Sequence, residues 1–177
     1  MRIKGRAWQR LATAIAVPGI AIGTLAGAGI APAMASTTHH SAYKWETIRG
    51  YDHGDNGIVP VWAYGAFYDH GVINLNGADP GVTGLRFSRG VLRVYHKSVS
   101  QSMRVNPKSC YAVFRDKADY QILGGTGRYR HAKGWGVAYV SFSGVLPKKN
   151  GKCNENANPL PGTALETFLA QGPASLH

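Results

Sequence analysis

The residue best placed for acid–base chemistry is Asp69, which follows Tyr68 at the end of the apolar run 58–68. A carboxylate beside an apolar wall has a raised pKa, which suits it to give or take a proton near neutral pH. The pair His70-Gly71 comes directly after it, and an Asp in that position is equally typical of an ordinary turn. Asp69 is therefore a candidate catalytic residue, with a turn role as the simpler interpretation.

A second set of candidates lies in residues 124–134, GGTGRYRHAKG, where four glycines stand among four basic residues. Arg128, Arg130 and Lys133 have the chemistry to bind a carboxylate or to stabilise an oxyanion, and solvated turn charges are the alternative. Lys133 is the second candidate catalytic residue and Arg128 a candidate ligand-binding residue. A phosphate-binding loop is excluded, because no GK[ST] follows and no helical pattern comes next. The glycines instead predict a tight turn between strands.

Aromatic side chains lie on two strands that are apolar on both faces, residues 61–68 and 135–142. Tyr64, Tyr68 and Tyr139 are the candidates to line a site for a flat ligand, although most strand aromatics belong to cores or interfaces. A strand on a solvated sheet would alternate with polar residues. Both faces must therefore be covered, one by a barrel interior and the other by a loop, helix or second subunit. A closed sandwich without a cavity is the alternative.

No motif predicts a metal site or a hydrolase. The segment DHGDNG, residues 52–57, offers oxygen ligands but lacks the closing Glu of a calcium loop, so we expect an Asx-rich turn there. The sequence holds no GxSxG, HExxH or CxxC pattern. From these motifs we therefore expect no metal site and no hydrolase chemistry.

The first 35 residues have the organisation of a secretory signal peptide. Basic residues precede an apolar stretch over residues 11–30, and Ala33-Met34-Ala35 forms an A-x-A cleavage site. An uncleaved membrane anchor is the alternative. Cleavage after Ala35 would leave 142 of the 177 residues, 36–177, as one secreted domain that contacts a membrane only during export.

Charge and cysteine content agree with an extracellular protein. Without the four basic residues of the leader, 16 Lys and Arg remain against 9 Asp and Glu, a formal charge of +7. This charge is scattered, whereas nucleic-acid binders usually show a basic stripe, so we expect no nucleic-acid partner. Cys110 and Cys153 are the only cysteines, and a pair in an oxidising compartment predicts one disulfide bond.

Short runs rich in aromatic and β-branched residues, separated by Gly, Pro, Asn and Asp, predict an all-β fold. No segment sustains a helical period. The expected strands cover residues 43–49, 58–68, 72–74, 83–87, 91–98, 102–105, 111–114, 120–123, 135–145 and 163–170.

Residues 122–134, ILGGTGRYRHAKG, resemble the GGTG-[KR]-[FY]-R-x-A-[KR]-G signature of plant dirigent proteins and are similar to the related allene oxide cyclase-like barrels of bacteria. The resemblance covers about a dozen positions, with an apolar final strand as further support. It implies an eight-stranded antiparallel β-barrel of calycin-type architecture, often trimeric, that works without metal or cofactor.

The same resemblance implies a function. Such a barrel would bind a small apolar or phenolic molecule and direct a cyclisation or a stereoselective coupling, by holding a reactive intermediate in one conformer. The alternative on the same barrel is a non-catalytic binding protein that is extracellular or associated with the cell envelope.

Overall fold

The computed structural model describes residues 43–54, 56–75 and 81–176. The predicted signal peptide and its cleavage site at Ala35 lie outside these residues. Within the described ranges, no helix is both long enough and apolar enough to cross a membrane.

The described chain consists almost entirely of β-strands, as expected. The elements are β1 (Lys44–Asp52), β2 (Ile58–Tyr64), β3 (Asp69–Asn74), β4 (Val82–Phe87), β5 (Gly90–Val105), β6 (Tyr111–Gly125), the 3-10 turn η2 (Gly127–Tyr129), β7 (Lys133–Val145), β8 (Lys148–Lys149), β9 (Lys152–Cys153) and β10 (Leu165–Ser175). Eight strands close into an antiparallel barrel in the order β1-β10-β7-β6-β5-β4-β3-β2, and β8 and β9 form a separate hairpin. The prediction of an eight-stranded antiparallel barrel is confirmed.

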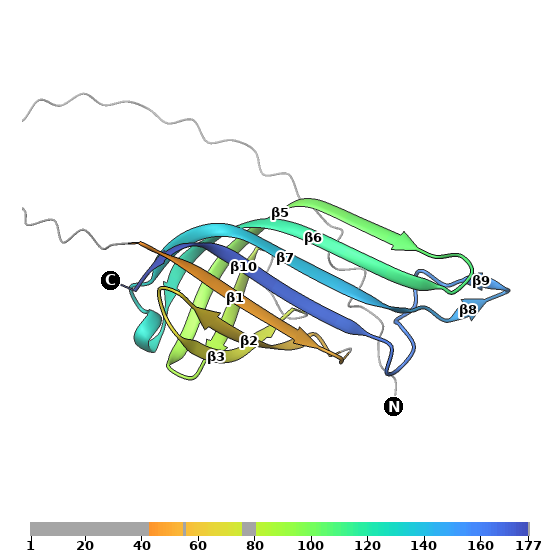
Figure 1. The fold of residues 1–177 in the computed structure, drawn as a ribbon, viewed down its shortest axis with the longest axis horizontal. Coiled ribbons are helices and arrows are strands. Elements are labelled where there is room, and N and C mark those ends of the chain that lie inside the picture. Colours follow the sequence, from red (N-terminus) through yellow and green to blue (C-terminus); the bar gives the residue numbers. More distant parts are fainter. Residues whose placement is uncertain (1–42, 55, 76–80, 177) are drawn as a thin grey trace, which may run out of the picture.

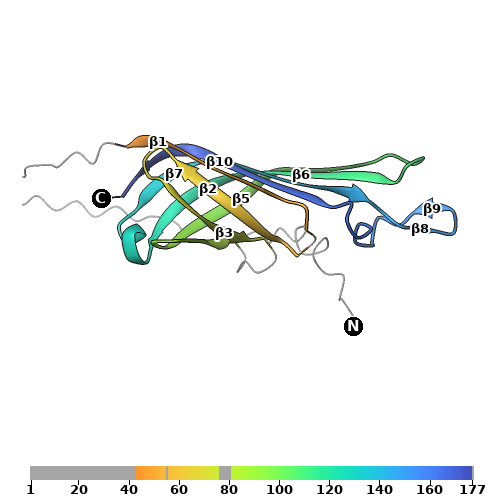
Figure 2. The ribbon, with the colours of Figure 1, turned by 60° about the horizontal axis from the view of Figure 1, so that its bottom comes forward.

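The barrel is uneven in length. Strands β5 and β6 have 16 and 15 residues, whereas β3 and β4 have 6 each. Figure 1 shows β5, β6, β7 and β10 running on past the shorter strands toward the β8–β9 hairpin. Figure 2 shows the short strands closing the barrel on the other side, with η2 at the end opposite that hairpin. The protein therefore has a barrel end near η2 and a sheet-like extension at the other end.

Two pairs of predicted strands are single long strands. Residues 91–98 and 102–105 both belong to β5, and residues 111–114 and 120–123 both belong to β6. The polar residues between them predicted loops, but they pair across the β5–β6 ladder, with a register shift between Ser98 and Ser100. Most of β5 beyond residue 97 is exposed, so a hydrophobic alternation is not required for it to remain a strand.

The predicted strand 58–68 is too long, because β2 ends at Tyr64. Gly65 has a φ of +134°, and a Cβ there would lie 1.9 Å from the backbone oxygen of Trp45. Only glycine fits this position, which turns the chain away from the strand. The chain then returns as β3, beginning at Asp69.

Residues with even numbers on β1, β6, β7 and β10 face the barrel interior, where burial is highest. One row across these strands runs Ile48, Ala170, Ala138 and Ala118, so short side chains line this wall. Val140 also faces inward but is only half-buried. It packs against the buried residues of the core.

A second row begins at Glu46 and passes through Gly172, Gly136 and Tyr120. The two glycines belong to strands that approach closely, because a Cβ on Gly136 would lie 2.0 Å from the backbone oxygen of Gln171 and 2.9 Å from the Cα of Gly172. No side chain therefore stands between Glu46 and Tyr120 along this row.

A methyl group at Gly136 is expected to lower the free energy of unfolding by about 2 kcal/mol, because the neighbouring backbone must move away to admit it. The matched control is Gly84→Ala on β4, where the nearest atom to the new Cβ is a Val91 methyl carbon at 3.3 Å. Urea unfolding of both variants measures the difference. Equal stability of Gly136→Ala and Gly84→Ala would contradict the close approach of β7 and β10.

Candidate ligand site inside the barrel

The central polar group of the barrel interior is the carboxylate of Glu46 on β1. Only 1% of this residue is exposed. The backbone N–H of Phe67 donates to its Oε2 at 3.0 Å, while Oε1 has no hydrogen-bond partner among the described residues. A buried carboxylate oxygen without a donor is costly, and native proteins seldom retain one without a role.

Burial raises the pKa of Glu46 from its ordinary value of 4.5 to about 7. Backbone hydrogen bonds, led by that of Phe67, offset part of this rise because they stabilise the charged form. The carboxyl group therefore changes its charge near neutral pH, the range in which a proton donor or acceptor works best.

Two tyrosines interact with Glu46 from other elements. Burial raises the pKa of Tyr120 on β6 to about 12, and the charge of Glu46 adds to the rise. Burial also raises the pKa of Tyr129 in η2, with further contributions from Asp69 and Glu46. Both phenols therefore stay protonated at neutral pH, so each keeps its one O–H for donation.

The η2 end of the interior is closed by three buried aromatic rings. Tyr129 is fully buried, and its ring centroid lies 5.1 Å from that of Phe67 and 5.4 Å from that of Phe87. Because Phe67 also donates to Glu46, this cluster forms the floor beside the carboxylate. Toward the opposite end, where β6 and β7 run on, the inward-facing Phe142 is half-buried, and its ring centroid lies 6.2 Å from that of Phe114.

Asp69 lies at this floor, but with the opposite pKa shift from the one expected. Burial alone would raise the pKa of Asp69, yet hydrogen bonds from Ser88, Tyr129 and the backbone lower it to about 2. The Tyr129 hydroxyl donates to Asp69 Oδ2 at 2.6 Å. The prediction of a raised pKa is wrong, because the carboxylate accepts several hydrogen bonds at a partly exposed strand end. In this geometry Asp69 positions Tyr129.

Replacing Tyr129 with Phe is expected to destabilise the fold by about 1–2 kcal/mol, because it removes a hydrogen bond to a charged group and leaves the ring packing intact. Asp69→Asn should cost a similar amount, and the double variant should cost clearly less than the sum. Urea unfolding of the four proteins gives the coupling free energy. Strictly additive effects would show that the two side chains do not interact.

A second polar group lies farther along the interior, on β4, β5 and β6. Thr83 Oγ1 and His96 Nε2 are 3.0 Å apart, and the Ser98 hydroxyl donates to Asp116 Oδ2 at 2.9 Å. Burial lowers the pKa of His96, although the charge of Asp116 partly offsets this. Asp116 is only 8% exposed, and its Oδ1 has no hydrogen-bond partner in the described ranges. The interior thus holds two buried carboxylates with an unpartnered oxygen, Glu46 and Asp116.

The residues predicted as a site are not brought together. Tyr64 packs on the outer surface beneath Arg49, whose guanidinium carbon lies 5.1 Å from the ring centroid. Tyr68 is 73% exposed, and Tyr139 is 46% exposed on the outer face of β7. Arg128 and Lys133 are exposed at the η2 end. Asp69 is the candidate whose side chain hydrogen-bonds a floor residue, Tyr129, and the backbone of Tyr64 hydrogen-bonds Glu46.

The described residues leave the outer aromatic face uncovered. Trp135, Tyr139 and Trp62 are each about half-exposed, and Tyr43 packs on Trp135 with the ring centroids 5.0 Å apart. The expectation that one face of each two-faced strand lines a barrel interior is met. Cover for the outer face by a second subunit stays a prediction.

Sequence reasoning missed Glu46. The signal was present, because Glu46, Ile48 and Gly50 share one face of the first strand and Ile48 marks that face as buried. A carboxylate on the apolar face of a strand is the pattern to look for.

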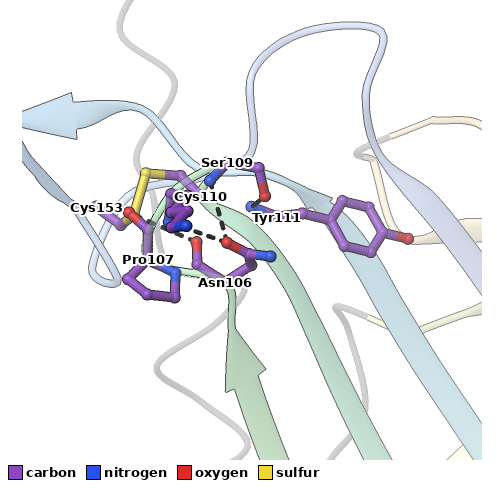
Figure 3. The surroundings of a disulfide bond; sticks show 7 residues. Asn106, Pro107, Ser109, Cys110, Tyr111 and Cys153 are labelled. Atoms are coloured by element: carbon purple, nitrogen blue, oxygen red, sulfur yellow. Dashed lines mark hydrogen bonds between the residues drawn. A yellow bond between two sulfur atoms is a disulfide. The ribbon is translucent and has the colours of Figure 1, made fainter.

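The predicted disulfide between Cys110 and Cys153 is confirmed, and it lies far from Glu46, at the extension (Figures 1 and 3). In the preceding turn, the Asn106 side chain accepts from the backbone N–H groups of Lys108 and Ser109, and its carbonyl accepts from that of Cys110. The disulfide therefore fastens the β8–β9 hairpin to the β5–β6 turn.

The DHGDNG segment forms Asx turns where it is described. Asp52 accepts from the backbone N–H of Gly54 at 2.7 Å, and Asn56 accepts from that of Ile58 at 2.8 Å. In the described part of the chain, no three His, Cys, Asp or Glu side chains gather in a way that would hold a metal ion.

Comparison of this chain with protein-family models, with curated proteins and with solved structures finds no match. The closed barrel is shown by its strand pairing. Membership of the dirigent or allene oxide cyclase-like group stays a prediction that rests on residues 122–134.

Proposed function

We propose that this protein is a secreted barrel that binds a small apolar or phenolic molecule in its interior. The observation that carries the proposal is the unpartnered Oε1 of Glu46, a buried acceptor beside an aromatic floor. A ligand hydroxyl that donates to this oxygen would remove the cost of leaving it unsatisfied. Apolar walls with a few placed polar groups are the usual composition of small-molecule sites.

The rest of the interior supports the same ligand class. The row of Ala118, Ala138 and Ala170 gives an apolar wall of short side chains next to the row that holds Glu46. Tyr120 adds an aromatic ring to the row that holds Glu46. Secretion rests on the predicted leader and is supported by the disulfide, which persists in oxidising compartments.

Binding inside the barrel is tested with para-propylphenol and isothermal titration calorimetry. Ala138→Leu adds volume to the inward face of β7, and Val137→Leu is the matched control on the outer face of the same strand. We expect Ala138→Leu to abolish binding and Val137→Leu to retain it, with both variants folded by circular dichroism. Equal binding by the two variants would place the ligand outside the barrel.

Catalysis is a second candidate function, favoured by the pKa of about 7 at Glu46. In this role the Glu46 carboxylate removes a proton from a carbon next to a ligand carbonyl, the enolate closes a ring by attacking a second carbonyl of the ligand, and the carboxylic acid returns the proton to the alkoxide. Exchange of the α-protons of para-hydroxyphenylacetone in D₂O, followed by NMR, tests the step. The wild-type protein should accelerate exchange and Glu46→Gln should not. Exchange at the buffer rate with both proteins would leave a binding protein only.

A further inference from the structure

The charges of this protein are divided between the inside and the outside of the barrel. Glu46 and Asp116 face inward and are at most 8% exposed, and Glu166 on β10 is also buried. Every described Lys and Arg is exposed except Lys117, which is half-buried and occupies an outward-facing position of β6. A basic surface thus surrounds an interior in which Glu46 and Asp116 each have one buried oxygen without a hydrogen-bond partner among the described residues.

Burying these carboxylates without a positive partner costs free energy. A carboxylate taken out of water loses several kcal/mol of solvation unless a cation or several donors replace the water. Backbone N–H groups, led by that of Phe67, stabilise Glu46, and the Ser98 hydroxyl donates to Asp116 Oδ2, but one oxygen of each carboxylate has no hydrogen-bond partner among the described residues. His96 is close enough to Asp116 to feel its charge, but burial favours the neutral ring, so it supplies no counter-charge at neutral pH.

We propose that the barrel interior selects organic cations, namely molecules with an apolar or aromatic frame and a protonated amine, and that Glu46 holds the amine. This inference rests on the proposed function and names its ligand class. The Oε1 atom of Glu46 accepts one N–H of the ammonium group. Tyr120, whose buried ring interacts with Glu46 from β6, would stabilise the cation further.

Asp116 supports the same selection from farther along the interior. It stands four residues from Tyr120 on the same inward face of β6, which is about 13 Å at the usual rise of a strand. Its Oδ1 has no hydrogen-bond partner among the described residues, as is true of Glu46 Oε1. The interior is therefore acidic near Asp116 as well as near Glu46. A ligand carboxylate would meet two buried like charges and is therefore excluded.

The test uses three ligands that share one phenolic frame and differ only in the terminal group: tyramine with an ammonium, tyrosol with a hydroxyl and para-hydroxyphenylacetate with a carboxylate. Calorimetry at pH 8 should show tyramine binding at least tenfold more tightly than tyrosol, and no measurable binding of the carboxylate. The net positive surface would by itself favour the reverse order, so non-specific attraction does not produce this result.

Two variants assign the selectivity to the interior. Glu46→Gln should bring the ratio of tyramine to tyrosol affinity close to one, while Asp119→Asn, an exposed residue on the outer face of β6, should leave the ratio unchanged. Tyrosol binding as tightly as tyramine to the wild type would overturn the cation inference and leave the proposed function standing. If none of the three binds, both are overturned.

Discussion

Replacing Glu46 with Gln is expected to raise the free energy of unfolding at pH 8 by about 3 kcal/mol and to leave it nearly unchanged at pH 4. The reason is that Gln is neutral and close in shape to the protonated acid. In the wild-type protein, burial moves the pKa of this group from 4.5 to about 7. The folded state therefore resists a charge that the unfolded chain accepts readily.

The direction follows from proton linkage. Between pH 4.5 and 7 the folded protein binds more protons at Glu46 than the unfolded chain does, so wild-type stability falls as pH rises through this window. Below pH 4.5, Glu46 is protonated in both the folded and the unfolded state. Above pH 7, the full loss of stability is present. The neighbouring Tyr120 and Tyr129 remain neutral across the window because their pKa values are raised.

Urea unfolding at several pH values between 4 and 8 measures the effect, taken as the difference between wild type and variant so that other titrating groups cancel. Glu155→Gln is the matched control at an exposed position, and we expect a change within about 0.5 kcal/mol. A Glu46→Gln variant that is no more stable than wild type at pH 8 would show that the carboxylate is well solvated. A Glu46→Gln variant that is more stable than wild type and has lost ligand selectivity would behave as expected for a residue retained for function.

Removal of the disulfide by the paired change Cys110→Ala and Cys153→Ala is expected to lower the free energy of unfolding by about 4 kcal/mol. The two residues are 43 apart in sequence, and a loop of that length loses this much closure entropy in the unfolded chain. The bond joins the extension to the β8–β9 hairpin, so interior ligand binding should be retained in the folded variant (Figure 3).

Reduction supplies the control for this experiment. Wild type in dithiothreitol should unfold at the urea concentration of the double variant, and the double variant should be insensitive to the reductant. A loss below about 1 kcal/mol would show that the unfolded chain is already restricted in this region.

The barrel was predictable to the level of strands and turns, because alternation and glycine placement are local properties. The double-faced pattern of residues 135–142 indicated an inner and an outer face, and β7 has both. The polar middle of β5 was not predictable, since its strand conformation comes from pairing with β6 and not from its own sequence. For the same reason the sequence did not show that β2 ends at Tyr64, because the constraint on the following Gly65 is the backbone of Trp45.

The candidate site was less accessible from sequence. Asp69 was found because it follows an apolar run, but its pKa depends on Ser88 and on Tyr129, which is 60 residues away. Glu46 interacts with Tyr120 through a gap that Gly136 and Gly172 leave, and no local pattern reports such a relation. The sequence predicted ligand-binding tyrosines because aromatic rings suit ligands. Burial, which decides which rings can line an interior, is not visible in the sequence.

The most direct test of binding inside the barrel is an NMR measurement of intermolecular NOEs between bound para-propylphenol and the alanine methyl groups of isotopically labelled protein. Ala118, Ala138 and Ala170 lie in one inward-facing row, so a ligand above the Glu46 floor must come close to them. We expect NOEs from the propyl group to these three methyls, and none to the exposed rings of Trp62 and Trp135. NOEs to those outer rings without any to the alanines would contradict ligand binding inside the barrel.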